Sequence, residues 1–255
     1  MDIENLKEVA EDHNIYIAST QDIIDQTINQ IYQSYENDTQ EIKENFDEIV
    51  VKSEQYAYSV YLESQLNYGK EIISSFVQDL IDENEITSIS DVPSVIGSYF
   101  EAFDRFFLSL SQSRKTRAGS TFESILNALF QRLGYPFAYQ QVINGKPDFV
   151  MPSVDYFIRN PSDCIIFTSK RILRERWRQI ISEGALGAHF FLATIDDSIS
   201  SNTFEEMRSN RVNIVCPKKI INENYQTEDN VYSFNDFFTD HLDPAVTRWA
   251  RNGII

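Results

Sequence analysis

The segment KPDFVMPSVDYFIRNPSDCIIFTSK (146–170) decides the fold, because it contains two short apolar runs that predict neighbouring strands. Its first run, KPDFVM (146–151), follows FAYQQVI (137–143), and the dipeptide Asn144-Gly145 between them supplies the positive φ angles of a tight turn. We therefore expect these two strands to be antiparallel. Its second run, DCIIFTSK (163–170), has a continuous apolar centre and predicts a third strand.

The sequence on either side alternates helices with further strands. An amphipathic helix that stops at Gly134 is predicted for TFESILNALFQRLG (121–134). After the third strand the predicted elements are a helix, a buried strand, a short helix and a last strand, in the order ILRERWRQIISEG (172–184), AHFFLATI (188–195), FEEMRSN (204–210) and NIVCPKK (213–219). The fold class is therefore α/β, with a mixed central sheet flanked by helices.

The N-terminal part of the chain predicts several amphipathic helices between about residues 15 and 80. Apolar residues recur there at steps of three and four, first at Ile23, Ile24, Thr27, Ile28, Ile31 and Tyr32 and then at Tyr58, Tyr61, Leu62 and Leu66. The polar segment DENEITSISDVPS (82–94) predicts a connection. We therefore divide the chain into an acidic helical region, 1–90, and a core, 91–255.

The net charge of −17 lies entirely in the N-terminal part. Residues 1–100 contain four lysines, no arginine and 21 acidic residues, whereas residues 101–255 contain 18 basic and 18 acidic residues. Within residues 101–190 the 12 basic side chains outnumber the eight acidic ones, so this stretch is compatible with a phosphate backbone.

Composition also excludes several classes of protein. No apolar run approaches the ~20 residues that span a bilayer, and the acidic N-terminus does not resemble a signal peptide, so we expect a cytoplasmic protein without a membrane partner. Cys164 and Cys216 both lie in apolar runs, where a free thiol packs as a small hydrophobic group. The three histidines are scattered, and no cluster has the spacing of a zinc site.

Two charged residues at the ends of the predicted strands suggest a catalytic site. Asp148 lies in the second strand and Lys170 ends the third, so adjacent strands would bring both side chains to one edge of the sheet. A carboxylate there can hold Mg²⁺, and a lysine can orient an attacking water and offset charge on a phosphate. Such a site normally needs a second carboxylate, and Thr168 cannot supply it. Glu183 can return a carboxylate from the following helix, and Glu123 can add an outer oxygen ligand.

The stretch that begins at Lys170 carries five cations within nine residues. Arginine can bind guanine O6 and N7 through two hydrogen bonds, and glutamate can accept one from cytosine N4. Arg174, Glu175 and Arg176 could therefore recognise consecutive G·C pairs. The alternative is a solvated helix on which Glu175 pairs with its neighbouring arginines.

Three segments together resemble a known family. SRKTRAGSTFESILNALF (113–130), KPDFVMPS (146–153) and TSKRILRERWRQIISEG (168–184) are similar to motifs of type II restriction endonucleases of the EcoRII (C-terminal domain) and PspGI group, within the PD-(D/E)XK nuclease superfamily. The resemblance implies a restriction-endonuclease-like core with an N-terminal helical region. It implies catalytic roles for Asp148, Lys170, Glu183 and Glu123, with the metal on Asp148 and Glu183, and base recognition by Arg174, Glu175 and Arg176.

The resemblance also implies a substrate and partners. The substrate would be double-stranded DNA with a CCNGG- or CCWGG-like site, cut with Mg²⁺ to leave 5′-phosphate ends by a homodimer that flips the central bases. A DNA methyltransferase would protect the host's own sites. Arg114, Lys115 and Arg117 would lie in a DNA-contacting loop from Ser113 to Gly119.

Two residues of the acidic region are candidates for contact with a flipped base. Lys52 and Tyr56 lie one helical turn apart, so they could cap and stack on it. The alternative is a surface lysine and a half-buried tyrosine.

Two other functions are compatible with parts of the sequence. A nuclease of the same fold in DNA repair or mobile elements would share Asp148 and Lys170 without needing the Arg-Glu-Arg triplet. A non-enzymatic, acidic DNA mimic or regulatory protein would suit the N-terminal charge, but the acid-acid-lysine set argues against it.

Overall fold

The computed structural model describes residues 6–142, 146–173 and 189–255. It separates into two compact units, of which the first comprises Met1–Ile23 and Tyr56–Ala118 and the second Ile24–Gln55 and Gly119–Ile255. This division differs from the predicted regions 1–90 and 91–255. Residues 24–55 belong to the same unit as the sheet, and residues 91–118 belong to the unit of the N-terminal helices.

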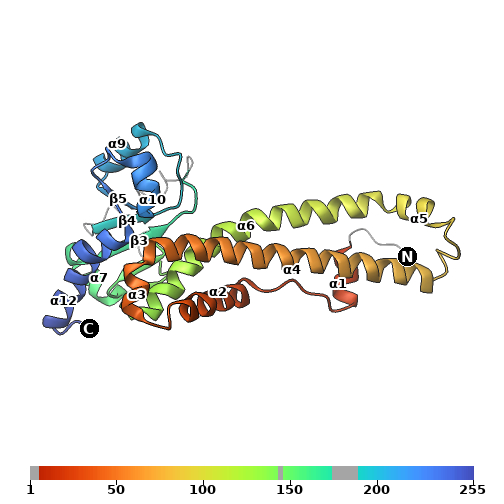
Figure 1. The fold of residues 1–255 in the computed structure, drawn as a ribbon, viewed down its shortest axis with the longest axis horizontal. Helices are drawn as coiled ribbons and strands as arrows, with labels where there is room; N and C mark the ends of the chain where they lie inside the picture. Colours follow the sequence, from red (N-terminus) through yellow and green to blue (C-terminus); the bar gives the residue numbers. More distant parts are fainter. Residues whose placement is uncertain (1–5, 143–145, 174–188) are drawn as a thin grey trace. The chain divides into compact units, whose positions relative to one another are not determined.

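Helices make up most of the described chain (Figure 1). The α-helices are α1 (Lys7–Asp12), α2 (Thr20–Ser34), α3 (Thr39–Glu44), α4 (Phe46–Asp82), α5 (Val92–Ser98), α6 (Phe100–Arg132), α7 (Val154–Arg159), α9 (Ser201–Ser209), α10 (Lys218–Ile220), α11 (Phe234–Asp236) and α12 (Asp243–Arg251). A 3₁₀ turn, η1 (Pro161–Asp163), and two π-helical segments, η3 (Ile221–Tyr225) and η4 (Phe237–Leu242), complete the helical structure.

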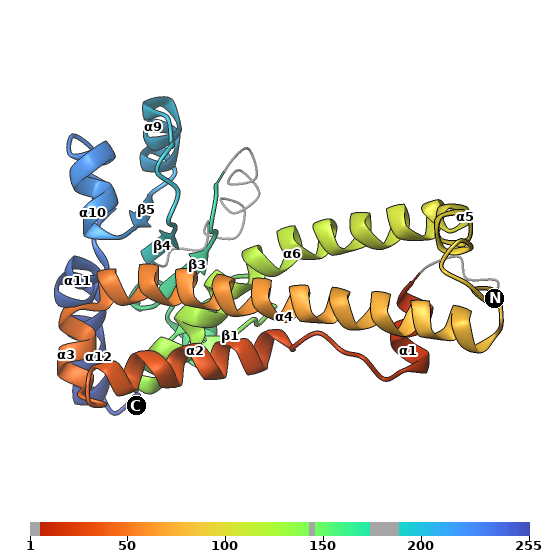
Figure 2. The ribbon, with the colours of Figure 1, turned by 45° about the vertical axis from the view of Figure 1, so that its right-hand side comes forward.

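The first unit is helical, and within it α4 and α6 run side by side (Figures 1 and 2). Phe76 of α4 and Phe106 of α6 are fully buried in its core, together with Val9 of α1. The apolar spacing predicted from Tyr58 and Leu66 is wrong for the buried face, because both side chains are about half exposed. Tyr61 of the same predicted set is buried, and the other buried positions nearby are taken by Ala57 and Gln65. The amide of Gln65 is satisfied there by the Tyr61 hydroxyl and the Leu110 carbonyl, at 3.0 and 3.1 Å.

The second unit contains a six-stranded mixed sheet in the order β1-β2-β3-β4-β5-β6. Its strands are β1 (Ala138–Tyr139), β2 (Phe149–Met151), β3 (Ile165–Ser169), β4 (His189–Ala193), β5 (Val212–Val215) and β6 (Val231–Tyr232). The first three strands are antiparallel, with Phe149 opposite Phe167, and β3 to β6 are parallel. The predicted mixed sheet is confirmed, as are the five predicted strands, which correspond to β1 to β5. The dipeptide Asn144-Gly145, predicted to form the turn, lies outside the described residues.

Successive side chains of a strand point to opposite faces of the sheet, so the apolar strands here present apolar side chains on both faces. Helices cover both of these faces. On one face the core includes Val150, Ile166, Leu192 and Ile214, together with Phe204 and Met207 of α9. On the other face the rings of Phe149 and Phe167 lie 5.5 and 5.2 Å from that of Phe130 in α6, and Phe167 and Phe191 also contact Phe237 of η4. The helix α6 is thereby fixed against β2 and β3.

The C-terminal end of α6 matches the prediction from Gly134. The helix ends at Arg132, and Gly134 has a φ of +75°, a conformation that glycine adopts without strain. The amide of Tyr135 then donates to the Phe130 carbonyl at 3.1 Å, as in a glycine-terminated helix. The chain is thus turned from α6 directly into β1.

Candidate active site at the ends of strands β2 and β3

Asp148 lies immediately before β2, with its side chain against the end of β3. The antiparallel register places it beside Thr168 and Ser169, and its backbone carbonyl accepts a hydrogen bond from the Gln140 amide at 2.8 Å. Its Oδ2 accepts three more, from the Ser169 amide at 2.7 Å, the Ser169 hydroxyl at 2.9 Å and the Thr168 hydroxyl at 3.1 Å. Thr168, the residue that cannot act as the second carboxylate, therefore orients the first one. Sequence analysis missed this role.

Burial and neighbouring charges act in opposite directions on Asp148. Its side chain is only 6% exposed, and burial raises the pKa of the carboxyl group. The positive charge of Lys170 lowers that pKa, the negative charge of Glu123 raises it, and the hydrogen bonds from Ser169 lower it. The charges of Lys170 and Glu123 thus act in opposite directions on the Asp148 carboxyl group.

Glu123 reaches this place from α6 and is held by two residues of the β1 segment. Its Oε1 accepts hydrogen bonds from the Tyr139 hydroxyl at 2.8 Å and from the side-chain amide of Gln140 at 2.7 Å. Burial and the bond to Glu123 raise the pKa of Tyr139 far above its ordinary value, so the phenol stays a hydrogen-bond donor. One oxygen of Glu123 is thereby fixed in place.

The donor set fits a divalent metal such as Mg²⁺. The described residues donate hydrogen bonds to only one oxygen of Asp148 and one of Glu123, so each carboxylate keeps an oxygen for a hard cation. A cation would also relieve the repulsion between these two charges. Within the described residues no group of three potential metal ligands occurs. The remaining predicted ligand, Glu183, lies outside them.

Lys170 is positioned by the backbone at the end of β3. Its amide donates to the carbonyl of Ala193 at 2.9 Å, which continues the parallel pairing with β4 by one residue. The side chain is half-buried. The lysine therefore starts from a rigid strand end.

The residues that follow Lys170 are anchored to α4 and to the segment that follows β4. The Nε of Arg171 donates to both carboxylate oxygens of Glu54 in α4, each at 3.1 Å. The Arg171 carbonyl accepts from the Thr194 hydroxyl at 3.2 Å, and the Leu173 amide donates to Asp196 at 2.9 Å. Arg174, Glu175 and Arg176, the predicted base-recognition residues, begin at the next position and lie outside the described residues.

The predicted DNA-contacting loop is wrong as a loop, because residues 113–119 continue α6 as helix. The segment contains no proline, and Gly119 lies in open space within the helix. Arg114 is exposed, whereas Arg117 donates to the Ala18 carbonyl at 2.8 Å and its guanidinium lies 5.0 Å from the centre of the Tyr61 ring. Lys115 belongs to the same helix, and its side chain is not described.

Lys52 and Tyr56 are both in α4 and are four residues apart, as predicted. The ammonium group of Lys52 pairs with Glu48 at 2.7 Å, and both side chains are at least half exposed. Tyr56 is half-buried. Their contact with a flipped base stays a prediction.

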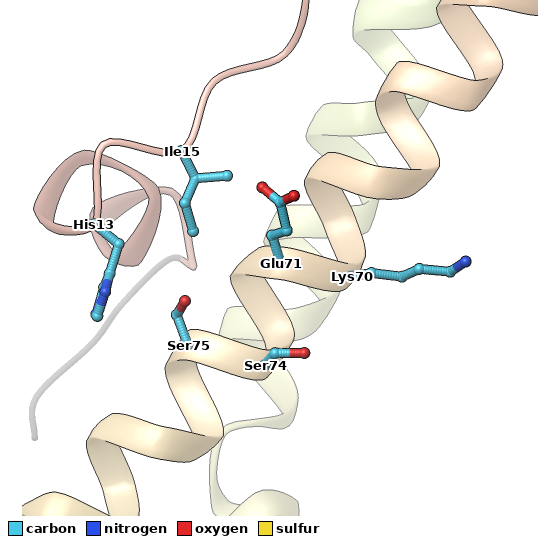
Figure 3. Close-up of a pocket in the computed structure, with 6 residues that line it drawn as sticks. All are labelled: His13, Ile15, Lys70, Glu71, Ser74 and Ser75. Carbon is cyan, nitrogen blue, oxygen red and sulfur yellow. The ribbon is translucent and has the colours of Figure 1, made fainter.

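The first unit also has a pocket of about 390 Å³ (Figure 3). It is lined by His13, Ile15, Lys70, Glu71, Ser74 and Ser75, none of which is a predicted site residue. His13 is bonded to Asp79 at 2.8 Å, and Figure 3 shows Lys70 pointing away from Ile15. The chemistry predicted from the sequence lies elsewhere, at the ends of β2 and β3.

Comparison with solved structures defines the class of fold. The chain resembles metal-depleted Ecl18kI in complex with uncleaved DNA, with a TM-score of 0.78 and 23% identity over 96% of this chain and 84% of that one. It also resembles PspGI in a complex with substrate DNA, with a TM-score of 0.63 and 20% identity over 91% of this chain and 94% of that one. The fold is thus the restriction-endonuclease-like fold of the PD-(D/E)XK type, as predicted.

Sequence comparison then identifies the family. The family model EcoRII C terminal matches residues 75–238, and the chain belongs to this family. The type II restriction enzyme SsoII of Shigella sonnei is 30% identical over 191 residues, which are 69% of this chain and 63% of the relative. The type II restriction enzyme EcoRII of Escherichia coli is 29% identical over 180 residues, 65% of this chain and 43% of the relative. The matched region therefore spans less than two thirds of either relative.

The sequence also makes expectations about the two cysteines and about membrane-spanning segments. Cys164 and Cys216 are buried free thiols, as expected from their apolar surroundings. Among the described helices, none combines the length and apolar character that crossing a membrane requires.

Proposed function

We propose that this protein is a type II restriction endonuclease that hydrolyses phosphodiester bonds in double-stranded DNA. The observation that carries the proposal is the buried carboxylate of Asp148, which Ser169 and Thr168 hold at the end of β3, next to Lys170, in a chain of the EcoRII C terminal family. A buried carboxylate beside a lysine is suited to phosphoryl chemistry, since it can hold a cation while the lysine stabilises charge on the phosphate.

Each described residue would have a distinct part in the reaction. Asp148, Glu123 and the predicted Glu183 would hold Mg²⁺, which when bound would polarise the phosphate and favour ionisation of a water. Ser169 and Thr168 would keep Asp148 oriented, and Tyr139 and Gln140 would do the same for Glu123. Lys170 would offset negative charge on the phosphate.

The finer parts of the proposal come from the family resemblance. The site would be CCNGG- or CCWGG-like, with Arg174, Glu175 and Arg176 recognising bases in the major groove and the products ending in 5′-phosphates. A homodimer would place one subunit on each half-site and flip the central bases, with Lys52 and Tyr56 in contact with them. We place this activity in the cytoplasm of a prokaryotic cell, beside a DNA methyltransferase.

The test is cleavage of unmethylated plasmid DNA that contains CCNGG sequences. With Mg²⁺ we expect discrete fragments, and sequencing of their ends identifies the site, the central base and the stagger. Lys170→Ala should abolish cleavage but retain specific binding. Lys219→Ala is the control, because this lysine is 83% exposed and pairs only loosely, at 3.9 Å, with Glu223.

Other outcomes distinguish the rival functions. Random degradation of the plasmid would favour a repair or mobile-element nuclease. Absence of cleavage on every CCNGG-containing DNA would contradict the proposed function and favour a non-enzymatic role. Equal loss of activity in Lys170→Ala and Lys219→Ala would remove Lys170 from the active site.

A further inference from the structure

The ion pair between Arg171 and Glu54 joins the end of the active-site strand to α4. The two residues are 117 positions apart in the chain. The Glu54 side chain is 7% exposed and that of Arg171 is 36% exposed, so the carboxylate is buried while the guanidinium reaches the surface. The glutamate is therefore the buried member of the pair, and the arginine is the partly exposed one.

The geometry of the pair occupies only part of the guanidinium. Both hydrogen bonds to Glu54 start from Nε, at 3.1 Å each. An arginine has five N–H donors, and the four on its Nη atoms donate to no described residue. The arginine side chain is also partly exposed, so its guanidinium carries donors that no described residue occupies.

Glu54 also limits the conformations of Arg171. A free arginine side chain loses rotamer entropy when it is immobilised, whereas one already held at Nε loses less on binding. The Thr194 hydroxyl fixes the backbone at the same residue through the Arg171 carbonyl. Arg171 is therefore oriented before any ligand arrives.

Its location indicates which anion would bind. Arg171 follows Lys170 directly, at the end of the strand whose Ser169 holds Asp148. A polyanion bound at this strand end for cleavage carries further phosphates on both sides of the reacting one. A planar guanidinium matches the geometry of a phosphate through two parallel hydrogen bonds.

We propose that Arg171 binds a backbone phosphate of DNA next to the cleaved bond, and that Glu54 is a positioning residue that presents the guanidinium to it. This inference rests on the proposed function. In the alternative, Arg171 only neutralises the buried carboxylate of Glu54 and does not contact DNA.

The experiment measures DNA affinity as a function of salt. All proteins carry Lys170→Ala, so that the cognate duplex is bound with Mg²⁺ but not cut. Glu54→Gln keeps an acceptor for Nε, and Glu54→Gln with Arg171→Ala removes the arginine without leaving a buried charge unpaired. Glu54→Ala removes the carboxylate that orients Arg171 and keeps the positive charge of the arginine.

Arg208→Ala is the matched control, since Arg208 is 43% exposed and is also held by acids, Glu228 and Asp229, at 3.2 and 2.7 Å.

We expect the Arg171→Ala double variant to reduce the slope of log affinity against log salt by about 0.9, the value for one phosphate contact. Glu54→Gln and Arg208→Ala should leave this slope unchanged. Glu54→Ala should weaken binding several-fold. If the double variant keeps the slope of the protein that carries Lys170→Ala alone, Arg171 is only a structural partner and the inference is overturned. If Glu54→Ala binds DNA more tightly than that protein, Glu54 competes with the phosphate and the inference is likewise overturned.

Two further measurements separate this inference from protein stability and from the proposed function. If the double variant is poorly folded, Glu54→Gln with Arg171→Lys keeps the charge but loses the fork. It should retain the slope and bind more weakly, and unchanged affinity would count against the inference. Failure of the proposed function is recognised separately, because the wild-type protein would then cut no DNA.

Discussion

Replacing Ser169 by alanine tests whether hydrogen bonds keep Asp148 ionised. The substitution removes the 2.9 Å bond from the hydroxyl to Oδ2 but leaves the 2.7 Å bond from the Ser169 amide and the bond from Thr168. A hydrogen bond to a charged group contributes about 1.5–3 kcal/mol, and the lower value is appropriate here because the same oxygen keeps two other donors. A loss of about 1.5 kcal/mol lowers the ratio of ionised to protonated Asp148 by roughly tenfold.

The sign of the pH effect follows from the causes of the pKa. Burial already raises the pKa of Asp148, and the Ser169 bonds lower it, so Ser169→Ala should raise it further. A metal-binding carboxylate must be ionised, so activity should fall as the pH drops through this pKa. We expect the acid limb of the pH–rate profile to move to higher pH, with cleavage roughly tenfold slower on that limb. At pH values above this pKa, the cleavage rate of Ser169→Ala should stay within about twofold of the wild-type rate.

The assay is kcat at saturating DNA and fixed Mg²⁺, measured across the pH range. Ser53→Ala is the matched control, since Ser53 is fully buried and its hydroxyl has no hydrogen-bond partner among the described residues. Its profile should coincide with that of the wild type. Equal slowing of Ser169→Ala at every pH would refute the reasoning, because it would show a loss of geometry rather than of ionisation.

Two further predictions concern stability and thiol chemistry. Asp148→Asn should abolish cleavage yet raise the Tm without metal, because a carboxyl whose folded pKa is raised costs stability as the pH rises above its ordinary value. Calorimetry should show this gain growing from acid to neutral pH, whereas Mg²⁺ should stabilise only the wild type; a lower Tm at neutral pH would contradict the assigned cause. Burial raises the pKa of both cysteine thiols, Cys164 and Cys216, to about 12, so a thiol reagent at pH 8 should label the protein only after unfolding. Rapid labelling of the folded protein would show that these positions open to solvent.

The parts of the fold that sequence analysis predicted have local causes. Five consecutive strands are predicted, the first of them together with the turn signal Asn144-Gly145 and the other four from their apolar runs, and Gly134 marks the end of α6. The juxtaposition of Asp148 and Lys170 followed from two adjacent strands. Strand β6 was missed, because Val231 and Tyr232 are too short a run to show alternation.

The missed features depend on contacts between distant residues. Arg171 was counted as one of five cations near DNA, and nothing in the local sequence indicates that Glu54 is its partner. The loop at residues 113–119 is what the family resemblance implies, whereas the structure continues α6 through them.

The threonine at 168 explains why the second acid must come from another element. Thr168 is 1% exposed, and its hydroxyl lies 3.1 Å from Oδ2 of Asp148, within the same network as Ser169. A glutamate there would place a second negative charge against Asp148 in a buried position, and it would remove a donor that Asp148 uses. Thr168→Glu would therefore not rescue the loss of a helix carboxylate. We therefore expect a metal at this site to be shared between Asp148 and acids from other segments, such as Glu123 on α6, which Tyr139 and Gln140 hold in place.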